Sequence, residues 1–146
     1  MKHSHGIKQS YVSGKMFVAG LLSIFAFSAN SYAAETCPAI SGITATPISQ
    51  ERGFTYAANS IRGGWKGENP RATESYLDKV KFTSAAIRQT TENGNPVYFV
   101  ACDYEGDGSA GVRMSQRFPV AAKPVGPAWK DEYCSAELSE CTFKFD

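Results

Sequence analysis

Three carboxylates follow one another closely in the second half of the chain, at Asp103, Glu105 and Asp107, and Gly108 comes directly after them. This spacing resembles the start of a calcium loop, in which alternating residues supply oxygen ligands ahead of a glycine. The complete loop needs a bidentate carboxylate at its twelfth position, where this chain has Met114. We therefore interpret the segment as a solvated hairpin turn, with weak calcium binding as the alternative. Glycoside hydrolysis would need two carboxylates converging across a cleft, which spacing within one loop does not indicate.

Two other groups of residues could bind a ligand. Trp65 lies among glycines and charged residues in 62–70, a segment that we interpret as a loop. An exposed tryptophan there could stack on a sugar or anchor a protein partner, or it could fold back over a small core as a lid. Arg88, Arg113 and Arg117 take outward positions on predicted strands and could share one sheet face. They could bind an acidic group of a partner or glycan, or pair with carboxylates on the same face.

The chain has four cysteines, all beyond residue 33: Cys37, Cys102, Cys134 and Cys141. An even number in a short exported chain favours two disulfides. Zinc held by four thiolates is a weaker alternative, because the spacings contain no close CxxC pair. Sequence does not choose among the three possible pairings. We favour Cys37–Cys102 with Cys134–Cys141, because the second pair is close enough to staple a terminal hairpin or loop.

The first 33 residues have the pattern of a cleaved signal peptide. A basic stretch, 1–15, precedes an apolar run, 16–27, and a segment of small residues ends in Ser31 and Ala33. The apolar run is shorter than the ~20 residues that span a membrane. We expect cleavage after Ala33, with cleavage after Ala34 as the second choice.

Other interpretations of this segment have less support. A buried core helix would not usually lie between a basic tail and a small-residue site. Lipidation at Cys37 would need a small residue before it, where the chain has Thr36. Retention as an uncleaved anchor has no positive support. We expect no membrane insertion after cleavage.

Removal of 1–33 changes the chemistry of the chain. Its two histidines, His3 and His5, leave with the signal, which excludes Ser-His-Asp and Cys-His catalysis and histidine-ligated metals from the mature part. The remaining 12 basic and 14 acidic residues give a net charge of −2, against +1 for the whole chain. This balance does not indicate nucleic-acid binding. We expect no cofactor and no metal.

The hydrophobic pattern beyond residue 33 predicts strands. Residues 79–90, 97–104 and 111–120 form a predicted antiparallel meander, with turns at 91–96 and 105–109. We expect the middle strand to be covered on both faces. Further expected elements are an edge strand or extended arm at 40–50, a strand at 53–61, one or two helical turns at 70–77, a segment outside the sheet at 121–127 and a last strand at 141–146.

A family resemblance covers the chain beyond the signal. The segments that carry it are Cys37-Pro38, Gly63-Gly64-Trp65 with Glu68-Asn69-Pro70, Tyr76-Leu77, residues 100–106 and residues 111–114. On these motifs the chain resembles short exported bacterial proteins grouped as domain of unknown function 3757. The resemblance implies a bacterial exported protein without assigned chemistry, and it carries no catalytic residues.

These observations predict one fold and one kind of function. The fold is a single, mainly β, antiparallel meander or sandwich-like domain over residues 34–146, with two disulfides and at most one short helix. We expect a non-enzymatic binding protein of the periplasm or the extracellular space, with a protein partner in the envelope or host. The alternatives are a glycan-binding module and a carboxylate-dependent hydrolase.

Overall fold

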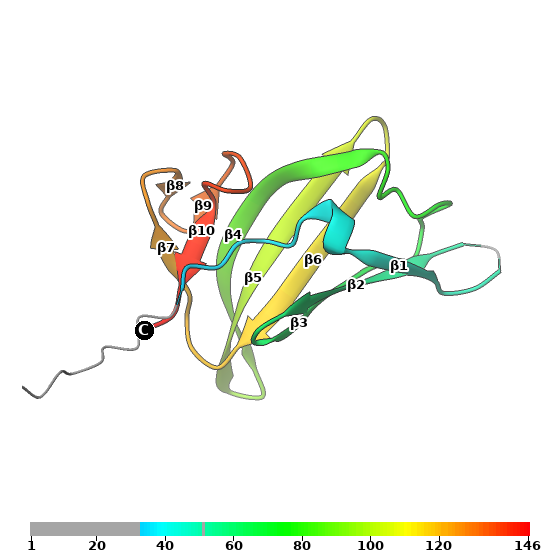
Figure 1. The fold of residues 1–146 in the computed structure, drawn as a ribbon. Coiled ribbons are helices and arrows are strands. Elements are labelled where there is room, and N and C mark those ends of the chain that lie inside the picture. The colour runs from blue at the N-terminus through cyan, green and yellow to red at the C-terminus, as the bar shows by residue number, and fades with distance from the viewer. Residues whose placement is uncertain (1–32, 51) are drawn as a thin grey trace, which may run out of the picture. The chain divides into compact units, whose positions relative to one another are not determined.

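The strands form two antiparallel sheets in the computed structural model, which describes residues 33–50 and 52–146 (Figure 1). The larger sheet has the order β1-β2-β3-β6-β5-β4-β9-β8, and β10 pairs with β7 in the smaller one. The strands are β1 Thr44–Pro47, β2 Phe54–Ser60, β3 Gly63–Asn69, β4 Val80–Glu92, β5 Asn95–Gly106, β6 Gly111–Phe118, β7 Lys123–Val125, β8 Trp129–Lys130, β9 Tyr133–Cys134 and β10 Thr142–Lys144. A single 3-10 turn, η1 Ile40–Gly42, is the one helical element of the described residues. The predicted fold class, mainly β and antiparallel, is confirmed.

The described residues all belong to one compact unit, which runs from Ser31 to Asp146. The predicted signal peptide lies, except for Ala33, outside the described residues. Within those residues we find no helix with the length and apolar character needed to cross a membrane.

The predicted meander is confirmed as β4, β5 and β6. Asn93 and Gly94 connect β4 to β5 with φ values of 51° and 81°, the left-handed backbone of a two-residue hairpin turn. On β5, Val100, Cys102 and Tyr104 alternate toward the core, whereas the side chains between them are only half-buried. The middle strand is therefore central, as expected, but fully covered on one face only.

The prediction of a loop at 62–70 is wrong. Most of this segment forms β3, an interior strand between β2 and β6. Glycines are typical of turns, but Gly67 lies inside a strand and allows the backbones of β3 and β6 to approach each other closely. A Cβ there would lie 2.2 Å from the carbonyl oxygen of Arg113 and 3.1 Å from Sδ of Met114. Glycine inside a strand often marks such an approach.

The prediction of helical turns at 70–77 is also wrong. Asn69 does cap a turn, because its Oδ1 accepts a hydrogen bond from the backbone of Arg71 at 3.1 Å. No helix follows, since the carbonyl of Ala72 accepts instead from the backbone N–H of Gly53, at 2.8 Å. Tyr76 then takes a left-handed φ of 60°, which ends any right-handed turn.

Both disulfides have the favoured pairing, Cys37–Cys102 and Cys134–Cys141. The first ties the N-terminal segment to the inner face of β5, and Tyr104 reinforces it by donating its hydroxyl to the carbonyl of Pro38 at 2.6 Å. In Figure 1 this segment crosses in front of the meander. Burial is the main reason that the pKa of the Tyr104 hydroxyl lies above its ordinary range, with the charge of Asp103 adding to it.

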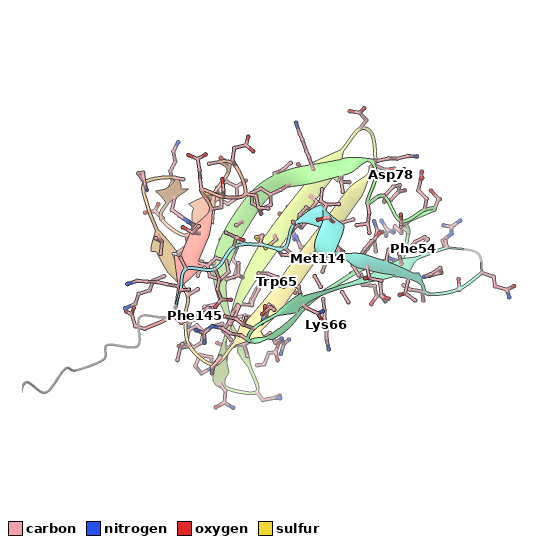
Figure 2. The ribbon with its side chains drawn as sticks, viewed as in Figure 1. Phe54, Trp65, Lys66, Asp78, Met114 and Phe145 are labelled. Carbon is pink, nitrogen blue, oxygen red and sulfur yellow. A yellow bond between two sulfur atoms is a disulfide. The ribbon has the colours of Figure 1, made fainter. Side chains whose placement is uncertain are left out.

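The inner face of the larger sheet packs on the C-terminal strand. Phe143 and Phe145 alternate toward the core, as predicted, and Trp65 meets the ring of Phe143 edge-on at 6.4 Å between centroids. Phe118 stacks on Phe145 at 4.3 Å. Figure 2 shows Trp65 and Phe145 within the domain. Such aromatic pairs add to the large apolar area that the rings bury.

Replacing Gly67 by alanine should lower the free energy of unfolding by about 1–3 kcal/mol, because the added methyl group overlaps the backbone of β6. The matched control is Gly42→Ala, where a Cβ meets nothing within 4 Å. That variant should stay within about 0.5 kcal/mol of the parent. Urea denaturation followed by circular dichroism measures both. Equal stability of the two variants would contradict the close approach of β3 and β6.

Replacing Trp65 by alanine should lower the free energy of unfolding by about 3–5 kcal/mol, because the ring is only 3 % exposed. The control is Ile61→Ala on the neighbouring turn, where the side chain is 83 % exposed. That change should leave stability within about 0.5 kcal/mol. The same denaturation experiment measures both, and an unaffected Trp65→Ala variant would show that the ring is outside the core.

Candidate functional site

The outward face of the meander carries the predicted arginines. Arg88 on β4 lies opposite Phe99 on β5, which in turn lies opposite Arg117 on β6. Residues opposite each other on paired strands project to the same side, so these three form one row. Arg113 lies on the same side of β6, four residues before Arg117, and is opposite Asp103 on β5. The prediction that these arginines share one outer face therefore agrees with the register.

The three arginines differ in their partners. Arg113 binds Asp103 through two hydrogen bonds, of 2.6 and 2.9 Å, and this contact raises the pKa of its guanidinium. Arg117 binds Glu92 in the same two-pronged way, at 2.6 and 2.9 Å. No ion pair of the described residues involves Arg88. Of the three, Arg88 is therefore the one whose charge is not neutralised by a neighbouring carboxylate.

The acidic segment that resembled a calcium loop forms a tight hairpin turn. The backbone N–H of Gly106 donates to Ala110 at 3.0 Å, and that of Ala110 donates to Asp107 at 3.2 Å. Asp103 stays on β5, bound to Arg113. Across the described ranges, no group of three or more His, Cys, Asp or Glu side chains is arranged to hold a metal.

Trp65 is not a surface residue, so the contact role assigned to it is wrong and the alternative of a core residue holds. It lies on β3, with its ring facing inward, whereas its neighbour Lys66 faces outward (Figure 2). A ring with 3 % exposure cannot stack on a sugar. Trp129 is buried as well, and its Nε1–H donates to the carbonyl of Thr142 at 2.7 Å.

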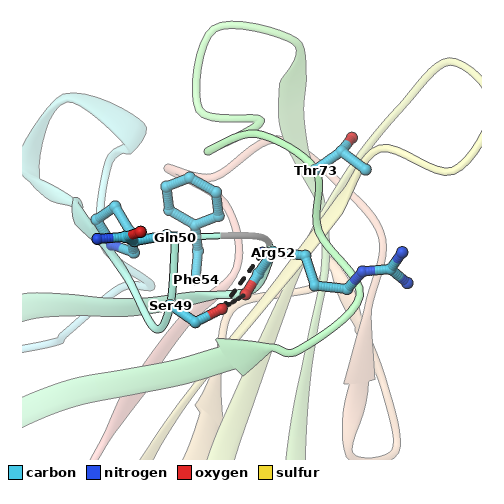
Figure 3. A pocket seen from close by; sticks show the side chains of 6 residues that line it. Ser49, Gln50, Arg52, Phe54 and Thr73 are labelled. Carbon is cyan, nitrogen blue, oxygen red and sulfur yellow. Dashed lines mark hydrogen bonds between the residues drawn. The ribbon is translucent and has the colours of Figure 1, made fainter.

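A hollow of about 560 Å³ opens beside the turn between β1 and β2 (Figure 3). Phe54 and Pro47 provide apolar surface, and Gln50 and Arg52 from the turn stand around it, with Thr73 on the neighbouring segment. No local pattern predicts this hollow, because its sides come from separate segments. They meet through the hydrogen bond between the backbones of Gly53 and Ala72.

A second hollow, of about 600 Å³, lies between β3 and β6; we call it the β3–β6 notch. The hollow is lined by Arg62, Gly63, Gly64, Lys66, Ser115, Gln116 and Arg117. Arg62 is paired with Glu35. Gln116 occupies an inward position of β6, between Met114 and Phe118, and is 3 % exposed. Gln116 is not among the predicted site residues, although a polar residue at a core position of an alternating strand is a signal that could have indicated it.

Comparison with protein families shows one match, which covers residues 31–144 and bears the description "Protein of unknown function (DUF3757)". Comparison with curated proteins and with solved structures gave no match. The matched span contains the motifs on which the resemblance stood, together with all four cysteines and both hollows. Since the match extends over most of the sequence, the chain belongs to the DUF3757 family.

Proposed function

We propose that this chain is an exported, non-enzymatic binding protein of the bacterial envelope or the extracellular space, and that its partner is a protein. Residues 1–33 act as the signal peptide in this proposal, and residues 34–146 as the binding domain. Two kinds of observation support it: the buried disulfides with the N-terminal pattern, and the composition of the outward sheet face.

The cysteines support export. All four are at most 1 % exposed, and each disulfide joins segments that pack in the core. Disulfides of this kind form and persist where the environment is oxidising, as in the periplasm or outside the cell. The charged start, apolar run and small-residue end of 1–33 have the pattern of a signal peptide, which agrees with export to such a compartment.

The observation that carries the binding proposal is the row Arg88–Phe99–Arg117 on the outward face. Arginine and aromatic side chains are enriched at the centres of protein interfaces, where they combine area with directed hydrogen bonds. Phe99 is half-buried between two exposed arginines, on the central strand β5, which is paired with β4 and β6 along this stretch. The row is therefore held rigidly before any partner arrives, which lowers the entropy that binding costs.

The two alternatives have less support. The glycan-binding interpretation relied on Trp65 as an exposed ring, and that ring lies in the core. The hydrolase interpretation relied on carboxylates facing one groove. Asp103 and Glu105 do line one open hollow of about 290 Å³ together with Glu68, but Asp103 is engaged there by Arg113, and Asp107 is not part of the lining.

Export predicts a defined N-terminus. Protein recovered from the envelope or medium should begin at Ala34, because Ser31 and Ala33 supply the small side chains that signal peptidase requires. Mass spectrometry of the intact, unreduced protein measures this, and Ala33→Phe should block the cut. A chain that keeps residues 1–33 in the cytoplasm would contradict export, whereas a start at Glu35 would move the cut by one residue.

The outward row predicts a charge-sensitive interaction. Arg88→Glu should abolish crosslinking of the exported protein to its envelope or host partner without lowering stability, because Arg88 forms no ion pair among the described residues. The matched control is Arg71→Glu, an exposed arginine outside the meander that is likewise free of ion pairs in that part of the chain. Crosslinking followed by mass spectrometry compares the captured proteins. Capture by Arg88→Glu equal to that of the parent would show that this face is not the binding surface.

A further inference from the structure

A second row of residues crosses the outward face of the larger sheet, beside the row Arg88–Phe99–Arg117. We call it the central row, and from β9 to β3 its residues are Tyr133, Ala86, Ala101, Ser115 and Lys66. Each is opposite the next on paired strands, so all five project to one side of the sheet. Ser115 lies two residues before Arg117 on β6, which places the two rows on the same face.

The middle of the central row is low, because its side chains are short. Larger side chains stand in the rows on either side: the row Arg88–Phe99–Arg117 on one, and the ion pair of Asp103 with Arg113 on the other. The residues between them are Ala86, Ala101 and Ser115. A chain that runs across the strands can therefore approach the sheet most closely along this row.

Two cations on this part of the face are not neutralised. Lys66 and Arg88 are exposed, and no ion pair formed by the described residues includes either of them. Arg117 lies between them in the neighbouring row and is already held by Glu92. Charges that are complementary across an interface steer association and select partners, so this surface favours an acidic partner.

The carboxylates nearby do not compete for these two cations. Glu35 pairs with Arg62, the remaining basic residue of the β3–β6 notch. Asp103 is held by Arg113, on the side of the central row away from Arg88. Glu68 follows Lys66 by two residues on β3 and is exposed on that same side. The face is therefore positive on one side of the central row and negative on the other.

The strand order sets the spacing of Lys66 and Arg88. Their strands, β3 and β4, are separated by β6 and β5, which gives three strand spacings, or about 14 Å. An extended chain advances about 3.3 Å per residue and its side chains alternate, so residues i and i+4 project to one side about 13 Å apart. Residue i+2 projects to the same side between them and would face Ala101 and Ser115.

We propose that the central row binds an extended segment of a protein partner in which two acidic residues lie four positions apart, with a small residue midway between them. The two carboxylates pair with Lys66 and Arg88, and the small residue packs on Ala101 and Ser115. Tyr133, which is 45 % exposed, continues the row beyond β4 and offers an aromatic ring to the rest of the segment. The inference rests on the proposed function and names the chemistry that its partner presents to this face.

An acidic glycan fits the row less well. A polyuronate carries a carboxylate on every sugar, so some of its charges would lie above Ala101 and Ser115. The outward residues there offer no cation to pair with them, and removing an unpaired charge from water lowers affinity. Carboxylates that are spaced to match the two cations avoid this loss.

The test is a titration of the oxidised, exported protein with the pentapeptide acetyl-Glu-Thr-Ala-Thr-Glu-amide, which is too short to form a helix. Two-dimensional ¹H–¹⁵N NMR follows the backbone amides of Arg88, Ala101 and Ser115, which should shift to saturation. Two control peptides are acetyl-Gln-Thr-Ala-Thr-Gln-amide, which lacks the charges, and acetyl-Thr-Glu-Glu-Thr-Ala-amide, which has them side by side. Each should bind at least ~3-fold more weakly, since exposed ion pairs contribute modestly. High salt should weaken binding of the first peptide.

Three results of the titration would overturn the proposal. One is the absence of a saturable shift up to the solubility limit of the acidic peptide. Another is binding of either control peptide as tight as that of the first, since the charges or their spacing would then play no part. The third is tighter binding of tetragalacturonate than of the acidic peptide, which would assign the face to an acidic glycan.

Substitutions of the cations test the assigned contacts. Lys66→Gln should bind the acidic peptide at least ~3-fold more weakly and bind the uncharged control peptide as the parent does. The matched control is Arg71→Gln, an exposed cation outside the larger sheet, which should leave both affinities unchanged. Equal losses in the two variants would show that net charge, and not the central row, governs binding.

Ala101→Phe tests the low middle of the row without changing any charge. The ring fills the space between the flanking rows, so binding of the acidic peptide should be lost. Val97→Phe is the control, because it adds the same bulk at an outward position of β5 outside the central row. Full binding by a folded Ala101→Phe variant would overturn the assigned path, and if that variant does not fold, Ser115→Phe decides by the same criterion.

Failure of this inference differs from failure of the proposed function. If Arg88→Glu abolishes crosslinking to the partner while the acidic peptide binds no better than its controls, the face binds a protein but not by this motif. If the peptide binds as expected while crosslinking is insensitive to Arg88→Glu, the central row recognises acidic segments and the captured protein uses another surface.

Discussion

The link between Cys37 and Cys102 holds the N-terminal segment against the centre of the sheet, and much of the domain depends on it. The bridge closes a loop of 65 residues, which in the chain-entropy account stabilises the fold by about 4 kcal/mol. Tyr104 adds its hydrogen bond to Pro38 on the same strand. Two residues before the bridge, Glu35 exchanges backbone hydrogen bonds with Phe143, at 2.7 and 2.9 Å. The segment thus connects β5 to the C-terminal strand, whose rings fill the core.

Because the inner face is occupied in this way, the outward face and the sheet margins are the surfaces that remain accessible. The outward side of the meander is polar, and two of its three arginines already form ion pairs with carboxylates of the same domain. A partner that recruits Arg113 or Arg117 must compete with these pairs, whereas Arg88 is available without that competition. The register places Asp103 beside Arg113. Arg117 lies opposite Phe99, as Arg88 does, but Glu92 at the end of β4 reaches it.

The glycines of β3 act in two opposite ways. At Gly67 the missing side chain lets β3 come close to the backbone of β6, and at Gly63 and Gly64 it leaves the notch open. Gln116 lies at that opening, at a position where Met114 and Phe118 on either side are apolar. An apolar residue there would stabilise the core more, because neither polar atom of the amide has a hydrogen-bond partner among the described residues.

Local pattern was sufficient for the meander, its Asn93-Gly94 turn, the inward and outward sides of β6 and the alternation of Phe143 and Phe145. Each of these depends on neighbours within a few residues, where alternation and turn chemistry act directly. The even cysteine count also predicts two disulfides, and the short spacing of Cys134 and Cys141 favours the observed pairing, although the sequence does not choose it. Only the tertiary structure decided that 62–70 is an interior strand, that Trp65 is core and that Gln116 faces a hollow. In the first two cases the deciding contact comes from β6 or β10, and for Gln116 it comes from β3. Each contact joins residues more than forty positions apart in sequence, and no local pattern of side chains carries that information.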